Sequence, residues 1–354
     1  MAATIKDIAE ETGLGLATIS SYINGGHVRE KNRVCIEEAI KKLHYEVNET
    51  ARGLKTNRTK TIGVVIPELN NTFCAEVLTS MEDVLRRHSY ATIICDCRTN
   101  QKLEKEAIDF LLRKRVDGII NMPVDTSGKN LEAFVDSGKP IILIDRRIRT
   151  MHCNSICVNN REAAENAIGE FLKNGHDRIG IIAGPEGLYT ADERLKGCLK
   201  KLKEAGIRQE DRFIYHGDHT IQSGIDGLKT LVKNCPDMTA VFATNYEMTM
   251  GAMIAVNELG IRIPQDLSFI GFDNLSFAKA CTPSLTIVVQ PTAEIGKKAA
   301  QMILKHLEEP KDEKAKGAKE DGSYLRHDIT LKTEIEEGKS VRSLYPKKLK
   351  EVSQ

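Results

Sequence analysis

The sequence lacks any long apolar segment. No stretch of its 354 residues is apolar over the roughly 18 positions that a transmembrane helix needs, so no membrane span is predicted. The amino terminus, MAATIKDIAEE, is charged from Lys6 onward, unlike a secretory signal. We therefore expect a cytoplasmic protein.

The sequence also has no large excess of positive or negative charge. The 51 Lys and Arg residues balance 50 Asp and Glu residues, so composition neither requires nor excludes a polyanionic partner. Whether the chain binds nucleic acid must therefore be judged from the local placement of its polar and charged groups.

The nine cysteines include no CxxC pair. In a chain that is not exported, an odd number of scattered cysteines favours reduced thiols packed as small hydrophobic groups. Metal ligation by Cys95, Cys97 and a distant histidine is the alternative, but the spacing does not favour it. We expect no metal and no cofactor.

Motifs of the common enzyme classes are absent as well. The chain contains no GxxxxGK[ST] loop, no HExxH helix, no GxSxG elbow and no GxGxxG after a predicted strand. The sequence therefore nominates no catalytic chemistry. Its length still suffices for two or three domains with sizeable cores.

Residues 1–47 predict a small helical domain, the headpiece. Thr4 and Asp7 resemble a capping box, Gly13 and Gly15 predict a tight turn, and a second helix over 16–24 follows. This order predicts a helix-turn-helix, and any other small helical bundle is the alternative. A third helix over 30–43 is predicted to turn these residues inward: Val34, Ile36, Ala39, Ile40 and Leu43.

Residues 48–60 are basic and poor in apolar side chains, which indicates a linker. From Thr61 onward, apolar runs alternate with amphipathic helical stretches, which predicts an α/β fold with parallel, doubly wound sheets. So many strands over about 280 residues predict two lobes, with a ligand site beyond the strands' carboxyl ends. The runs are TIGVVIP, ATIIC, VDGIINMPV, PIILID, SICVN, RIGIIAGP, AVFAT, LSFIGFD and LTIVVQP.

Several motifs between roughly residues 3 and 340 resemble those of one known protein family and occur in the same order, which makes a chance similarity very improbable. The chain resembles the LacI/GalR family of bacterial transcription repressors, and its linker is especially similar to the purine repressor branch. The motifs are TIKDIAEETGLGLATISSYING, VREKNRVCIEEAIKKLHYEVN, ARGLKTNRTKTIGVVIPELNNTF, KRVDGII, ILIDRR, NGHDRIGIIAGP, ERLKG, MGAMIAVNELGIRIPQDLSFIGFDN and TPSLTIVVQP.

The resemblance implies a homodimer whose headpieces bind a near-palindromic operator. It implies a hinge over 48–60 and a core over 61–340 like that of periplasmic sugar-binding proteins, followed by a tail over 341–354. The two core lobes would interleave, roughly as 61–158 plus 291–322 and 159–290 plus 323–340. A small molecule between the lobes would set operator affinity.

The second headpiece helix contains no Arg or Lys, yet the resemblance places it in the major groove. Leu16 and Ala17 would contact thymine methyl groups, and the Ser21 hydroxyl would bond a base edge. Phosphate contacts would come from hydroxyls, amides and an imidazole. The alternative for Thr18 and Ser20 is that they only cap or solvate the helix. The implied phosphate-binding residues are Thr4, Thr18, Ser20, Asn24, His27 and Asn48.

The hinge would supply the missing positive charge. Leu54 is a lone large apolar residue in a basic segment, and the resemblance makes it a wedge inserted into the minor groove. Lys55 would contact the groove floor or a phosphate, and Arg52 and Lys60 would add electrostatic attraction. From composition alone, intramolecular packing of Leu54 is the alternative.

The effector cleft follows from the resemblance too. Phe73 would stack on a sugar or base, and carboxylates would bind vicinal hydroxyls, although acidic residues at strand ends can also cap helices. Asn159 and Tyr246 stand where the family commonly has Asp, so a simple hexose is disfavoured. The implied effector-binding residues are Asn71, Phe73, Asp96, Asp145, Arg146, Asn159, Arg194, His219, Asn245 and Asp273.

The ligand class stays open among a sugar, a nucleoside or base, and a phosphorylated metabolite. A phosphoprotein co-regulator is also open, as in the catabolite-control members of the family. The rival function is a sugar-binding protein without specific DNA binding, and a shift assay with upstream DNA would separate the two.

The wedge hypothesis makes a direct prediction. Replacing Leu54→Ala should weaken operator binding sharply, because the unstacked and bent duplex would lose the side chain that stabilises it. Ligand binding by the core should stay intact. An unchanged operator affinity in a shift assay would end the wedge hypothesis.

Overall fold

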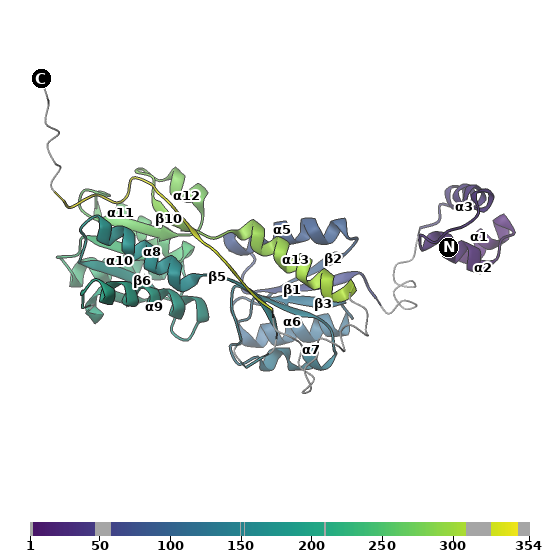
Figure 1. Ribbon diagram of the computed structural model, residues 1–354, viewed down its shortest axis with the longest axis horizontal. Helices are drawn as coiled ribbons and strands as arrows, with labels where there is room; N and C mark the ends of the chain where they lie inside the picture. Colours follow the sequence, from purple (N-terminus) through teal and green to yellow (C-terminus); the bar gives the residue numbers. More distant parts are fainter. Residues whose placement is uncertain are drawn as a thin grey trace, which may run out of the picture. The chain divides into compact units, whose positions relative to one another are not determined.

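The computed structural model describes residues 3–46, 58–148, 150–151, 153–208, 210–308 and 327–345. The chain divides into two compact units, residues 1–60 and 61–354 (Figure 1). Within each unit the described elements form their own hydrophobic cores. Four residues named above for DNA binding lie outside the described residues: Asn48, Arg52, Leu54 and Lys55.

The first unit confirms the predicted helix-turn-helix. Its described helices are α1 (Ile5–Thr12), α2 (Leu16–Ile23) and α3 (Glu30–Leu43). The Asp7 carboxylate accepts from the Thr4 amide at 2.6 Å, so an aspartate completes the capping box ahead of α1. Gly13 ends α1 in the left-handed region, at φ 65°, which glycine adopts without a steric penalty.

One predicted core position in this unit is wrong. Ile8, Ile19, Ile36 and Ala39 are buried, but Val34 is 44% exposed. A helix repeats every 3.6 residues, so a side chain two positions before Ile36 lies on the far side of α3. The apolar character of Val34 therefore misled the prediction.

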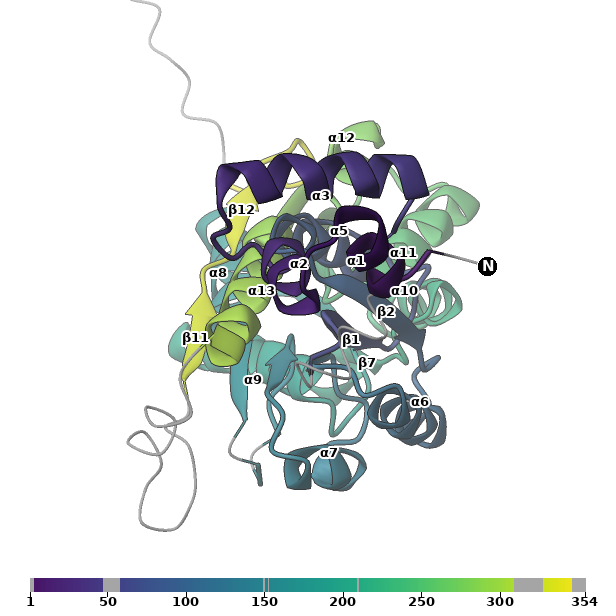
Figure 2. The same ribbon diagram turned by 90° about the vertical axis from the view of Figure 1, so that its right-hand side faces the viewer.

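The first lobe of the second unit is built on a parallel sheet in the order β11-β5-β4-β3-β1-β2. Helices α5 and α13 pack on one face and α6 and α7 on the other, as Figure 2 shows. The strands are β1 (Thr61–Ile66), β2 (Ala91–Asp96), β3 (Gly118–Asn121), β4 (Ile141–Ile144), β5 (Asn154–Val158) and β11 (Asp328–Leu331). The helices are α5 (Thr72–Arg87), α6 (Gln101–Arg113), α7 (Glu132–Asp136) after the 3-10 turn η1 (Lys129–Leu131), and α13 (Thr292–Glu308).

The second lobe repeats this plan with the order β12-β10-β9-β8-β6-β7. Helices α8 and α9 cover one face and α10 and α11 the other. The strands are β6 (Ile179–Ala183), β7 (Ile214–His216), β8 (Ala240–Ala243), β9 (Ser268–Phe272), β10 (Thr286–Val289) and β12 (Glu334–Glu336). The helices are α8 (Asn160–Lys173), α9 (Tyr189–Glu204), α10 (Ile221–Asn234), α11 (Tyr246–Leu259) and α12 (Leu275–Ala280), with the 3-10 turn η2 (Asp211–Phe213) before β7.

The apolar runs correspond to strands, but the sequence prediction missed three edge strands. β7, β11 and β12 are short and carry polar residues at alternate positions, so they do not look like strands buried on both faces. β12 also runs antiparallel to β10, unlike the other strand pairs described. The last crossing between lobes lies between Leu331 and Glu334, so residues 328–331 pair in the first lobe rather than the second.

A pair of glycines tests the packing of the core helices. A Cβ at Gly296 of α13 would lie 2.3 Å from the Val77 carbonyl oxygen of α5, whereas one at Gly169 of α8 would meet only Lys201 Cε, at 3.6 Å. We expect Gly296→Ala to lower the free energy of unfolding by about 1–3 kcal/mol through overpacking. Gly169→Ala should raise it by about 0.5–1 kcal/mol. Urea titration measures both, and equal effects would contradict this description of the helix interface.

Candidate functional site

A cavity of about 560 Å³ lies between the two lobes, where the strands of both sheets end. Asn71 follows β1 and Asp145 follows β4 in the first lobe, and Asn245 follows β8 and Asp273 follows β9 in the second. Parallel strands place their carboxyl ends at one edge, so polar residues from segments far apart in sequence meet here.

Most residues that the resemblance assigned to the effector line this cavity. Asp96 and Asn159 do not line it, and an effector contact by these two residues stays a prediction. Asp96 ends the edge strand β2 and accepts from the Arg98 amide at 2.9 Å. Asn159 turns away, because its Oδ1 accepts from the Thr333 amide at 2.8 Å. The predicted residues that do line the cavity are Asn71, Phe73, Asp145, Arg146, Arg194, His219, Asn245 and Asp273.

Asp273 lines the cavity and directly follows β9. The Gln290 amide nitrogen lies 3.0 and 2.9 Å from its two carboxylate oxygens. Burial raises the pKa of Asp273 to about 7, against the opposing effects of Arg194 and Gln290. The carboxyl group therefore exchanges its proton near neutral pH and can accept or donate hydrogen bonds to ligand hydroxyls.

Arg194 of α9 is held on three sides by the protein. Its Nε donates to Asn160 Oδ1 at 2.8 Å, its Nη1 donates to the Thr244 carbonyl at 2.7 Å, and its guanidinium carbon lies 3.7 Å from the Phe272 ring centroid. Burial lowers its pKa. The side chain is thus pre-organised, with its Nε–H and one of its four Nη–H groups already bonded to the protein.

Arg146 is held by fewer contacts, and among the described residues its Nε has no hydrogen-bond partner. Its Nη1 donates to the Pro123 carbonyl at 3.0 Å, and its Nε lies 3.4 Å from Asp145 Oδ2. Asp145 itself has φ 67°, a left-handed conformation at the end of β4 that turns the chain into the cavity wall. The ion pair with Asp145 offsets part of the charge that Arg146 offers to an anionic ligand.

His219 presents a neutral ring. Burial, with added repulsion from Arg194 and Arg146, lowers its pKa to about 3. Among the described residues its Nε2 has no hydrogen-bond partner. Because a buried polar atom normally finds a partner, this nitrogen is a candidate contact for a ligand.

Glu247 is the main cavity residue that the sequence reasoning missed. It accepts from Asn71 Nδ2 at 2.6 Å and from Asn245 Nδ2 at 2.7 Å, and burial raises its pKa. The family pattern directed attention to Asn245 and Tyr246, and nothing in the letters YEM distinguishes this glutamate from a surface residue of a helix. Other missed lining residues include Glu68, Asp218 and Gln290.

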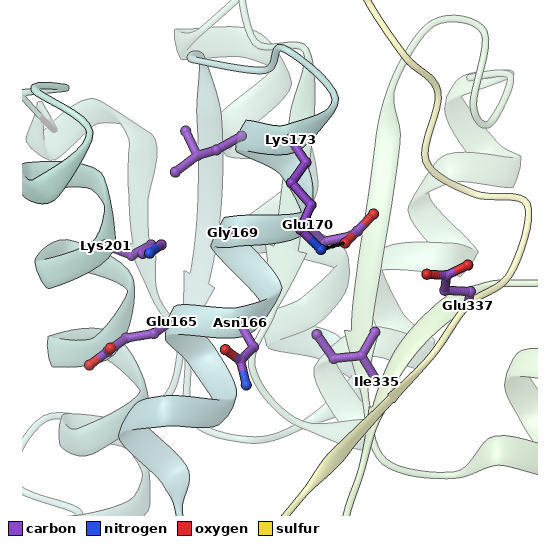
Figure 3. Close-up of a pocket in the computed structure, with 9 residues that line it drawn as sticks. Glu165, Asn166, Gly169, Glu170, Lys173, Lys201, Ile335 and Glu337 are labelled. Atoms are coloured by element: carbon purple, nitrogen blue, oxygen red, sulfur yellow. Dashed lines mark hydrogen bonds and ion pairs between the residues drawn. The ribbon is translucent and has the colours of Figure 1, made fainter.

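A second depression, shown in Figure 3, is a surface groove and not the candidate site. It lies along α8 and is bounded by Lys201 of α9 and by Ile335 and Glu337 at β12. Lys173 pairs with Glu170 at 3.0 Å along one side of it, within α8. The groove lies beside a helix rather than at the strand ends, and its lining comes from the second lobe alone.

In the headpiece, the start of α2 is accessible as predicted. Leu16 is 46% exposed and Ala17 is also exposed. The Ser20 hydroxyl lies 3.3 Å from Asn24 Nδ2, and the Thr4 hydroxyl donates to Asp7 at 2.9 Å. Thr18 and Ser21 are half-buried and His27 is exposed. Their contacts with DNA remain a prediction.

Comparisons with known proteins decide the family. Residues 59–322 match the family described as periplasmic binding proteins and sugar binding domain of LacI family, and residues 4–48 match the bacterial regulatory proteins of the lacI family. The chain belongs to the LacI family. The predicted fold, family and regulatory function are confirmed.

Two curated relatives and one structure illustrate the similarity. The transcriptional repressor PurR of Edwardsiella ictaluri is 35% identical over 85% of this chain and 89% of its own length. Catabolite control protein A of Priestia megaterium is 33% identical over 87% of this chain and 93% of its own. The lac repressor dimer bound to operator has a TM-score of 0.82, with 23% identity over 97% of this chain and 100% of that one.

This LacI-family protein is a DNA-binding transcriptional repressor with an effector-binding core, and it is a regulator rather than an enzyme. Of the helices that the structure describes, none combines the length and the apolar character needed to cross a membrane. Within those same residues, no group of three or more His, Cys, Asp or Glu is arranged to hold a metal ion.

The raised pKa of Asp273 predicts a pH dependence of stability. Between about pH 4 and about pH 7 the folded protein keeps a proton that the unfolded chain releases, so the free energy of unfolding falls as pH rises through this range. Asp273→Asn should flatten this slope. Urea titrations at several pH values measure it, with Asp226→Asn on the surface of α10 as the control. An unchanged slope in the Asp273 variant would contradict the assignment.

Proposed function

We propose that this repressor binds a near-palindromic operator as a cytoplasmic homodimer, and that a neutral polyhydroxylated molecule in the cavity sets its operator affinity. One helix-turn-helix covers one half-site, so a specific operator of ordinary length needs two. The similar lac repressor structure is a dimer on its operator, which supports this stoichiometry.

The side chains that line the cavity are the main evidence for the proposed class of ligand. Carboxylates of Glu68, Asp145, Asp218, Glu247 and Asp273 line it. The two arginines are already bonded to protein acceptors. Such a wall accepts hydrogen bonds from hydroxyl groups and disfavours a phosphorylated metabolite by charge repulsion.

The half-buried Phe73 adds an apolar surface to this polar wall. An aromatic ring packs well against the face of a sugar or a nucleobase. A sugar or a nucleoside therefore fits better than a phosphorylated compound. The family description, which names a sugar-binding domain, supports the same class.

Selection of duplexes from a random pool by the full-length protein tests the DNA-binding part. We expect near-palindromic sites without strong guanine requirements opposite α2, because that helix offers methyl groups and hydroxyls but no Arg or Lys. No enrichment, or enrichment of an isolated half-site, would contradict the proposal.

A matched pair of variants tests α2 itself. Leu16→Ala should weaken binding to the selected operator by about tenfold, since one lost base contact costs roughly 1–3 kcal/mol. Val34→Ala, which trims a side chain of similar exposure on α3, should leave the affinity unchanged. Anisotropy titrations measure both dissociation constants, and equal losses would argue against base contact by Leu16.

A further inference from the structure

A single carboxylate joins the first turns of two helices from opposite lobes. Asn71 Oδ1 accepts from the Cys74 amide at 3.0 Å and caps α5, while Asn245 Oδ1 accepts from the Met248 amide at 3.0 Å and caps α11. The side-chain nitrogens of both asparagines donate to Glu247, at 2.6 Å to Oε1 and 2.7 Å to Oε2. Each oxygen of the carboxylate thus serves one lobe.

Within each asparagine, the amide oxygen and the amide nitrogen cannot exchange places. Each carbonyl oxygen faces a helix N–H, so flipping either amide would set two donors against each other and remove the cap. Both NH2 groups are therefore directed at Glu247. Because the bond from Asn71 spans the cavity, the lobes cannot separate without breaking it.

The neighbouring residue, Tyr246, also lies near the start of α5. The Tyr246 side chain lies beside a small cavity that it lines together with Thr72, the first residue of α5, and Asn274, which caps α12. Its ring packs edge-on against Phe277, with 5.9 Å between centroids. The start of α11 therefore faces the start of α5 over two consecutive residues.

The surroundings of Glu247 strengthen its bonds. Burial raises its pKa and Glu68 opposes its charge, while Asn71 and Arg194 favour the ionised form. A carboxylate that has lost most of its water depends on these donors more than one on the surface does. Losing the Asn71 bond would leave it under-satisfied.

We propose that Glu247 is a latch between the lobes, which holds the cavity closed through the two asparagine caps and is strengthened or released by the effector. Its consequence for operator affinity rests on the proposed function, whereas the latch itself does not. A ligand that donates hydrogen bonds can compete with Asn71 for Glu247 Oε1. A ligand carboxylate or phosphate cannot, because it brings only acceptors and negative charge.

Hydrogen–deuterium exchange of the full chain, without DNA or added ligand, tests the latch. Asn71→Asp keeps an oxygen to cap α5 but replaces the donor with a second carboxylate facing Glu247. We expect exchange about tenfold faster in the first turn of α11, although the substitution lies in the other lobe. In the double variant Asn71→Asp/Glu247→Gln, the side-chain amide at position 247 can donate to the carboxylate at position 71, so the bond between the lobes forms again in the opposite direction. The exchange rate in the first turn of α11 should then return to within about threefold of the wild-type rate.

Glu258→Gln is the matched control, since it removes a carboxylate from the same helix that pairs with Lys229 at 2.7 Å on the surface. This control should leave the hydrogen–deuterium exchange rates in the first turns of α5 and α11 unchanged. The latch is refuted if Asn71→Asp leaves α11 unchanged, or if the double variant fails to restore protection. Neither outcome bears on operator binding, which the duplex selection measures separately.

Discussion

The structure depends on the common direction of parallel strands. Because the strands of both sheets carry their polar residues where they end, the cavity between the lobes collects Asp145, Asn245, Asp273 and their neighbours from distant parts of the chain. Burial of so many acids is unfavourable unless they are protonated or hydrogen-bonded, which accounts for the raised pKa values of Asp273 and Glu247. The site is therefore poised to respond to a molecule that supplies hydrogen-bond donors.

This arrangement also explains how ligand binding in the cavity can move the two lobes relative to each other. The chain crosses between the lobes near residues 158–160, 289–292 and 331–334, so the lobes are joined by short segments and otherwise meet through side chains. A ligand that changes the few contacts across the cavity shifts the balance between closed and open forms. Family membership places a DNA-binding unit on the same chain, and under the proposed function such a shift would alter operator affinity.

Much of the fold was predictable, because buried strands and amphipathic helices leave strong periodic patterns. The edge strands β7, β11 and β12 were not, since they are buried on one side at most and their pairing depends on residues far away in sequence. Within the site, strand-end residues such as Asp145 and Asp273 were predicted correctly as cavity-lining. Asp96 does not line the cavity, because β2 lies at the sheet edge. Glu247 was missed because only the tertiary structure brings Asn71 to it.

The most direct test of the account is the operator dissociation constant of the full-length protein with and without a sugar or nucleoside that raises its unfolding midpoint. A ligand that couples the cavity to the DNA-binding unit should change this constant by about fivefold or more, the usual range of allosteric coupling. The same dissociation constant in both conditions, with the cavity demonstrably filled, would contradict it.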